Sequence, residues 1–217
     1  MRLFSYVVAY DIGFAPNPYH GYCTLATCKQ DIRGRANVGD WIVGTGSARH
    51  RLADHLVYAM KIDEIVTYDQ YWDDPRFRDK RPKPIGSFKQ QYGDNIYHKN
   101  ASGDWLQLDG RHSLDDGSPN EGHIARDTKA DAVMIAKDFC YFGGEGPLIP
   151  SAFRDNAELS LVHGGRAYRV NFPADMTAAV IAWIEDDLPK GIQGVPRDWR
   201  TLTRTIRRRE TARARTA

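Results

Sequence analysis

The amino-acid sequence predicts an α+β protein with a mainly antiparallel, barrel-like sheet, short helices, a long polar insertion and helices at the C-terminus. Two observations support this prediction. Several short segments are rich in β-branched and aromatic residues, as strands are, whereas helical spacing is confined to a few stretches. The chain has 217 residues, of which 41% are hydrophobic and 27% charged, the composition of a globular protein.

The first third of the chain is predicted to alternate strands with turns. Residues 3–11, 22–28 and 41–46 are short apolar or aromatic segments typical of strands. Residues 29–40 predict a short helix that ends in a turn. Residues 55–68 are longer, and their apolar positions predict a strand with a bend.

The middle of the chain, residues 71–129, is the predicted insertion. It is dense in Gly, Pro, Asp and Asn and has little apolar periodicity, as long functional or disordered loops do. Isolated aromatic residues within it favour an ordered segment. Residues 95–108 predict a hairpin that turns at Ser102 and Gly103.

Regular structure returns in the last third. Residues 131–143 and 164–172 predict strands. Residues 173–188 predict a helix, because apolar side chains recur there at helical spacing. Residues 198–217 predict a basic helix. We therefore expect a single domain over residues 1–190 and a basic helix or tail over residues 191–217.

Charge is distributed unevenly along the chain. Residues 197–217 contain eight arginines and two acidic residues, a local charge of +6, so the net charge of +2 leaves −4 on the other 196 residues. A mildly acidic body argues against a domain that coats nucleic acid with its whole surface. The tail is either a solvated end or an electrostatic attachment to nucleic acid.

The sequence predicts a cytoplasmic protein without a membrane segment, because no run of about 18 apolar residues occurs. The N-terminal apolar stretch lacks a signal-peptide cleavage site and is interpreted as a strand. Cys23, Cys28 and Cys140 are an odd number at low density, which favours a reduced protein. Neither the cysteines nor the seven histidines have the spacing of a metal site, so we expect no metal and no cofactor.

A glycine-rich turn occupies residues 44–47. A phosphate-binding loop runs from a strand directly into a helix and carries a lysine, but the next periodic segment here predicts a strand. We therefore interpret the turn as the open end of a strand. Arg49 and Arg51 would lie at the lip of a pocket and attract phosphate without enclosing it.

Groups suited to proton transfer are close in sequence at two places. Asp94 and His98 stand in a loop-like segment, and Lys137 and Asp138 are adjacent on a predicted strand. Either pair would serve general acid–base catalysis if a substrate reached it. The alternative is structural: Asp94 and Asn95 cap a polar turn, and Lys137 and Asp138 face solvent.

Two segments combine aromatic rings with groups that suit a nucleotide. Around Trp72 and Arg76, aromatic and basic residues alternate, as on surfaces that stack bases and pair with phosphates. Tyr141 would wall a base, and Gly143 and Gly144 would let backbone amides approach a ligand. The alternatives are a tryptophan that anchors a charged loop and a tight turn that leaves a core strand.

Short motifs along the chain carry a family resemblance. They are Cys23-Thr24-Leu25-Ala26, Lys29, Ile32-Arg33, Gly39-Asp40-Trp41, Gly44-Thr45-Gly46-Ser47, Asp74-Pro75-Arg76-Phe77 and Tyr141-Phe142-Gly143-Gly144. This set resembles the nucleotide-modification-associated domain 2 family over residues 3–188. The resemblance implies an association with systems that modify nucleic-acid bases.

A shorter stretch, residues 29–64, resembles the core of the PUA superfamily, including its EVE and ASCH branches. Those small β-barrels hold RNA, or flipped modified bases, in a pocket walled by aromatic and polar side chains. The resemblance implies a PUA-like barrel, with Trp41, Trp72 and Tyr141 as candidates for stacking on a base or walling the pocket.

These observations predict a protein that binds a nucleotide, or a modified base in nucleic acid, within a modification or restriction system that includes protein partners. Trp72 and Tyr141 would stack, and Asp94 or Asn95 would read a base edge. The residues expected to contact phosphate or a base edge are Lys29, Arg33, Ser47, Arg49, Arg76, Asn95, Gly143 and Gly144.

Two alternatives stay open. The first is an enzyme that modifies or hydrolyses a nucleotide or base, with Asp94, His98 and Asp138 as acid–base groups. The second is a non-enzymatic module that docks to a partner through the arginine-rich tail.

Overall fold

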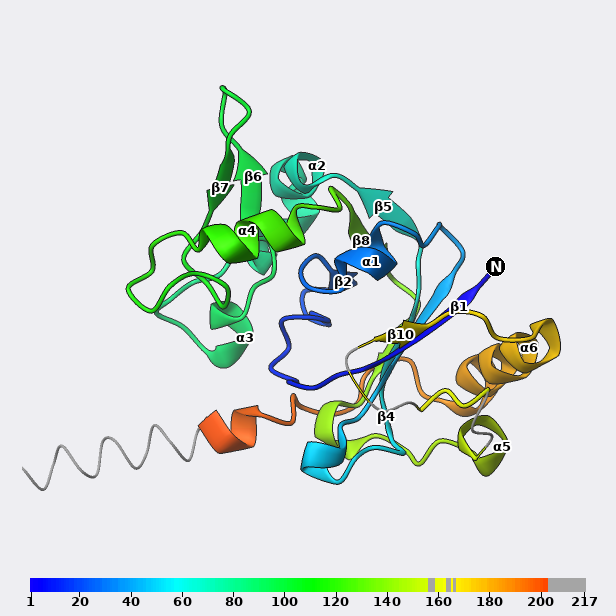
Figure 1. The fold of residues 1–217 in the computed structure, drawn as a ribbon. Helices are drawn as coiled ribbons and strands as arrows, with labels where there is room; N and C mark the ends of the chain where they lie inside the picture. The colour runs from blue at the N-terminus through cyan, green and yellow to red at the C-terminus, as the bar shows by residue number, and fades with distance from the viewer. Residues whose placement is uncertain (156–158, 163–164, 166, 203–217) are drawn as a thin grey trace, which may run out of the picture.

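The computed structural model of this chain describes residues 1–155, 159–162, 165 and 167–202. It is an α+β fold with mixed sheets and short helices (Figure 1). Residues 203–217, most of the predicted basic helix, lie outside the described residues.

The main sheet has six strands in the order β10-β1-β3-β4-β9-β11. Its strands are β1 (Leu3–Val7), β3 (Trp41–Thr45), β4 (Leu56–Lys61), β9 (Phe139–Tyr141), β10 (Tyr168–Arg169) and β11 (Gly191–Ile192). The pairs β1–β3 and β9–β11 are parallel, and the other neighbours are antiparallel. The predicted strands in residues 3–11, 41–46 and 164–172 are therefore present, each shorter than expected.

A second sheet continues the first around a bend. Its strands are β2 (Cys23–Leu25), β8 (Val133–Ala136) and β5 (Glu64–Val66), all antiparallel. Asp63 holds the bend, because its carboxylate accepts the N–H of Lys137 at 2.6 Å while its own N–H donates to Ile135. The strand predicted over residues 131–143 is thus two strands, β8 and β9, in two sheets. Six of the eight described strand pairs are antiparallel, but they do not close into a ring, so a closed barrel stays a prediction.

Both faces of the main sheet are buried, because successive side chains along a strand point to opposite faces. Phe4 and Tyr6 pack on one face with the second sheet, and Leu3, Trp41 and Val43 pack on the other. That second face is covered by the predicted C-terminal helix, which is α6 (Ala174–Ala182) followed by the π-helical turn η4 (Trp183–Asp187).

The polar middle region packs around a third core, which it shares with β8 and with residues near the N-terminus. Figure 1 shows the hairpin and helices α2 and α4 gathered on the side of the molecule opposite α5 and α6. Tyr68, Tyr71, Phe77, Tyr97 and Ile124 are buried in this core. The elements here are α2 (Tyr68–Asp73), η2 (Pro75–Lys80), α3 (Phe88–Gln91), β6 (Tyr97–Lys99), β7 (Trp105–Gln107) and α4 (Glu121–Asp127). The predicted hairpin is confirmed as β6–β7.

Short helical turns complete the described fold. They are α1 (Gln30–Arg33), η1 (Ala48–His50), η3 (Gly143–Glu145) and α5 (Ser151–Arg154). Of these, α1 confirms the short helix expected within residues 29–40.

The described part of the C-terminal segment packs against the rest of the chain. After β11, Arg197 and Asp198 bond to Asp11, and Trp199 donates from its indole to the carbonyl of Ile12 at 2.8 Å. The Trp199 ring stacks on Tyr19 with centroids 5.6 Å apart. These contacts attach residues 191–202 to the N-terminal loop, while the predicted domain boundary at residue 190 stays a prediction.

Candidate functional site

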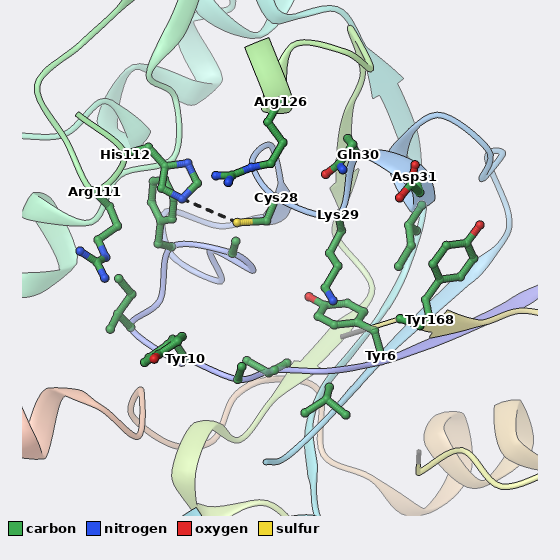
Figure 2. Close-up of a pocket in the computed structure, with 18 of the residues that line it drawn as sticks. Tyr6, Tyr10, Cys28, Lys29, Gln30, Asp31, Arg111, His112, Arg126 and Tyr168 are labelled. Carbon is green, nitrogen blue, oxygen red and sulfur yellow. Dashed lines mark hydrogen bonds between the residues drawn. The ribbon is translucent and has the colours of Figure 1, made fainter. Parts of the chain in front are cut away.

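A cavity of about 670 Å³ opens between the start of the chain and the polar middle region. It is lined by β1 and the segment after it, the residues around α1, the loop at Arg111 and His112, and Arg126 of α4. Figure 2 shows Arg111, His112 and Arg126 on one side, Asp31 and Tyr168 on the other, and Lys29 pointing toward the Tyr6 ring. A volume of this size is typical of small-molecule and cofactor sites.

Cys28 reaches the cavity because the chain turns sharply between β2 and α1. Cys28 and Lys29 both have left-handed backbone conformations, with φ of 57° and 42°. Such consecutive positions are strained for residues other than glycine and persist only where surrounding contacts hold them. The buried Arg33 supplies such contacts, because its guanidinium donates to the carbonyls of Cys28, Asp127, Ala130 and Ala132 at 2.5–2.8 Å.

Cys28, His112 and Asp127 form a chain of contacts at the wall of the cavity. Sγ of Cys28 lies 3.7 Å from Nε2 of His112, and Nδ1 of His112 lies 2.6 Å from Oδ2 of Asp127. Asp127 is fully buried, and its carboxylate also accepts the N–H of Cys28 and the hydroxyl of Tyr97, each at 3.0 Å. The carboxylate therefore fixes both the imidazole and the backbone of the cysteine.

Protonation of this cluster follows from its contacts. Burial lowers the pKa of His112, but the hydrogen bonds to Asp127 and Cys28 outweigh burial and raise that pKa to about 9. Burial raises the pKa of Asp127. The hydrogen bond from His112 and the positive charge of His112 outweigh burial and hold that pKa below its usual range. At neutral pH the pair is therefore an imidazolium held by a carboxylate.

Cations and aromatic rings share the rest of the cavity. The Lys29 ammonium lies 4.3 Å from the centre of the Tyr6 ring, and burial lowers the pKa of Lys29. The side chain of Arg126 is about half exposed, and Arg126 bonds to Nδ1 of His123 at 2.6 Å. Tyr10 is 60% exposed at the rim, so its ring is accessible to a ligand.

Among the sequence-predicted site residues, all of which lie in the described ranges, Lys29 is the one that lines this cavity. Arg49 lies at the rim, where it donates to the Tyr10 hydroxyl at 2.7 Å. Ser47 caps η1 by accepting the N–H of Arg49. Arg33 is placed beside the cavity wall with its guanidinium bonded to backbone carbonyls, and its contact with phosphate stays a prediction.

Asp94 and Asn95 lie buried in the core of the polar middle region. Asp94 accepts hydrogen bonds from Thr24 at 2.6 Å and Tyr71 at 2.9 Å, and burial raises its pKa. The buried Lys80 ammonium donates to the same Thr24 hydroxyl at 2.9 Å. Asn95 donates to two backbone carbonyls. Their predicted roles toward a base are not tested by these contacts.

Trp72 and His98 stack on each other with ring centroids 3.9 Å apart. The Arg81 guanidinium also lies over the Trp72 ring, at 3.6 Å. In the ranges that the structure describes, no hydrogen bond or ion pair joins His98 to Asp94 or to Asp138. The structure therefore does not bring the predicted acid–base groups together by direct contact.

Asp138, Arg76 and Trp41 lie in three other places. Asp138 forms an ion pair with Lys190 at 2.9 Å, and Arg76 bridges Glu64 and Asp74 on the surface. Trp41 is fully buried under α6.

Tyr141, Gly143 and Gly144 lie where β9 and η3 meet the C-terminal segment. The buried Tyr141 donates to Asp11, and burial raises the pKa of that carboxyl to about 6. A Cβ at Gly143 would lie 2.1 Å from the carbonyl oxygen of Val195, and one at Gly144 would lie 2.8 Å from Arg197. Both glycines thus permit close approach of residues 195–197.

Local sequence patterns do not connect Cys28, His112 and Asp127, which the structure brings into contact. Cys28 and His112 are 84 residues apart and Cys28 and Asp127 are 99 apart, so no local spacing connects them. His112 stands in a polar stretch without periodicity, and Asp127 ends a helix that the pattern did not predict.

Comparison with known proteins gives one match. The model of the nucleotide modification associated domain 2 family matches residues 1–203. No curated protein and no solved structure matches the chain significantly. Among the described residues, no helix combines the length and apolar character needed to span a bilayer.

Proposed function

The chain belongs to the nucleotide modification associated domain 2 family, and on this basis we propose that its cavity binds a nucleotide, or a modified base in nucleic acid, as a component of a nucleotide-modification system. The family match supports the setting in nucleotide modification. The cavity supports the binding role.

One observation carries this proposal: a single cavity of about 670 Å³ combines accessible aromatic rings with three cationic side chains. Pockets of about 300–1,000 Å³ accommodate ligands of nucleotide size. Tyr10 and Tyr168 offer faces on which a base can stack, and base–aromatic stacking contributes about 1–3 kcal/mol per base. Lys29, Arg111 and Arg126 offer charge for phosphate.

Polar groups in the same wall suit the edge of a base. Gln30 supplies an amide, and Asp31 supplies a carboxylate that accepts from an exocyclic amine. A PUA-like barrel and a cytoplasmic location belong to the same proposal. The three free cysteines favour a reducing compartment.

Calorimetric titration of the protein with nucleoside monophosphates, and with short oligonucleotides carrying plain or modified bases, tests the proposal. We expect binding that weakens with salt and falls about tenfold in Arg111→Gln and in Arg126→Gln, since a charged hydrogen bond contributes about 1.5–3 kcal/mol. Arg78→Gln is the matched control, because Arg78 is exposed on η2 and outside the cavity lining. Absence of binding to every nucleotide and oligonucleotide would reject the proposal.

A further inference from the structure

We propose that Cys28 is a catalytic nucleophile, activated by His112 and oriented through Asp127, which takes an acyl group from a ligand in the cavity and passes it to water. The ligand class is an acylated nucleotide, one that carries an acyl group on an exocyclic amine. That part rests on the proposed function, whereas the nucleophile rests on the cluster itself.

The order of the three side chains is that of a nucleophile, its base and the group that orients the base. Nε2 of His112 faces the sulfur of Cys28, and Nδ1 faces the carboxylate of Asp127, so the imidazole lies between the two groups. The thiolate is the reactive form of cysteine, and a neighbouring imidazolium stabilises it. Cys28 lines the cavity, so a bound ligand reaches its sulfur.

The other two cysteines lack this environment. Cys23 and Cys140 are fully buried in the sheets, and burial raises the pKa of both thiols, that of Cys140 to about 12. They are therefore protonated and inaccessible at neutral pH. Of the three thiols, all in the described ranges, Cys28 alone borders the cavity.

A metal site is the competing interpretation of the cluster. One ligand atom from each of Cys28, His112 and Asp127 lies within 4.8 Å of the others. However, Asp127 bonds to Nδ1 of His112 at 2.6 Å while the sulfur faces Nε2, and one imidazole cannot direct both nitrogens at a single ion. A metal ion at this place would be bound by the thiolate of Cys28 and Nε2 of His112, while Asp127 would bond to the other imidazole nitrogen. That gives the ion two protein ligands, whereas zinc sites have three or four.

The acyl transfer requires the Cys28 thiolate, the His112 imidazolium, the ligand and one water molecule. The Cys28 thiolate adds to the acyl carbonyl carbon, a C–S bond forms, and the C–N bond breaks as the imidazolium of His112 gives its Nε2 proton to the leaving amine. Water then adds to the thioester and loses a proton to His112, and the C–S bond breaks. The products are a carboxylic acid and the free amine, and the cysteine is regenerated as thiolate.

Reaction with p-nitrophenyl acetate, followed by intact-protein mass spectrometry and by nitrophenolate release, tests the nucleophile. We expect an acetyl adduct on Cys28 that is absent in Cys28→Ala, and nitrophenolate release that is about 100-fold slower in His112→Asn. Cys140→Ala is the matched control and keeps the adduct. Thermal melting of each variant checks that the fold is retained, and Cys28→Ser serves if Cys28→Ala does not fold.

An adduct that persists in Cys28→Ala, or release that is unchanged in His112→Asn, would overturn the proposal. So would stoichiometric Zn²⁺ binding that is lost in both variants, with no adduct in the wild type. Titration of the wild type with the same nucleoside monophosphates, beside its reaction with p-nitrophenyl acetate, separates the two proposals. Nucleotide binding without an adduct rejects the nucleophile and keeps the proposed function, whereas an adduct without nucleotide binding does the reverse.

Discussion

The imidazole of His112 donates from Nδ1 to the buried carboxylate of Asp127 at 2.6 Å, although the two residues are 15 positions apart on different elements of the polar middle region. The same carboxylate accepts the backbone N–H of Cys28 at 3.0 Å. The polar middle region is thereby joined to the turn between β2 and α1, and the junction forms one wall of the cavity. The contacts that join these segments therefore involve the same side chains as the proposed nucleophile.

The His112–Asp127 pair makes stability depend on pH in a defined direction. The pKa of His112 is raised to about 9 in the folded chain, above about 6.5 in an unfolded one. Its contribution, on the order of 3 kcal/mol, is therefore fully present below pH about 6.5 and is lost as pH rises through about 9. The pKa of Asp127 is lowered, so its contribution is lost as pH falls below about 4.

Urea unfolding of wild type and His112→Asn at pH 6, 8 and 10 measures this effect. The difference in free energy of unfolding is expected to be largest at pH 6 and smallest at pH 10. Equal differences at the two extremes would show that the charge of His112 does not stabilise the fold.

Replacing Arg33 should destabilise the protein through the turn at Cys28. Arg33→Lys removes the planar guanidinium group that donates to the carbonyls of Cys28, Asp127, Ala130 and Ala132. The ammonium group of lysine cannot donate to all four carbonyls. We expect a loss of about 2–4 kcal/mol in the free energy of unfolding. Arg35→Lys, at an exposed neighbour, is expected to cost less than about 1 kcal/mol, and a comparable loss in both variants would refute the assignment.

Gly143→Ala should displace the C-terminal segment. Gly143 has φ of 59°, and an added Cβ would lie 2.1 Å from the backbone oxygen of Val195. We expect a loss of about 2–4 kcal/mol and faster proteolysis near Trp199. The control is Gly21→Ala, where φ is 83° but no atom lies within 4 Å of the added Cβ, so only the backbone cost of about 1 kcal/mol applies. Equal effects in the two variants would remove the steric explanation.

Lys80 and Asp94 should behave as one buried unit. Lys80→Met leaves the carboxylate of Asp94 buried with its hydrogen bonds from Thr24 and Tyr71 but without the neighbouring positive charge. Lys80 donates to the Thr24 hydroxyl, which in turn donates to Asp94, and loss of a hydrogen bond from a charged group costs about 1.5–3 kcal/mol. The double variant with Asp94→Asn should cost less than the sum of the single variants in urea unfolding, and strict additivity would argue against coupling.

Local sequence patterns predicted those strands and helices in which the apolar residues follow a single regular spacing. Strand β1, strand β3 and the bent pair β4–β5 come from alternating or continuous apolar residues, and α6 comes from helical spacing. The break between β8 and β9 was not predictable, because the Asp63 carboxylate that holds it comes from 74 residues away. Strand β11 has two residues and exists through its pairing with β9.

Of the residues expected to contact a ligand, Lys29, which is one of the family-resemblance motifs, is the one that lines the candidate site. Trp72 and Asp94 were predicted from their residue types. In the structure, His98 stacks on the Trp72 ring, and the buried Lys80 lies near the Asp94 carboxylate. Cys28, His112 and Asp127 are brought together by tertiary packing of three separate segments. No sequence spacing encodes that kind of proximity.

The most direct test of the central claim is the rate of iodoacetamide alkylation at Cys28, followed by peptide mass spectrometry with and without nucleoside monophosphates. We expect Cys28 to react well ahead of the buried Cys23 and Cys140, and a bound nucleotide to slow the reaction by covering the sulfur. Alkylation of Cys28 at the same rate with and without every nucleotide tested would contradict a nucleotide site in this cavity.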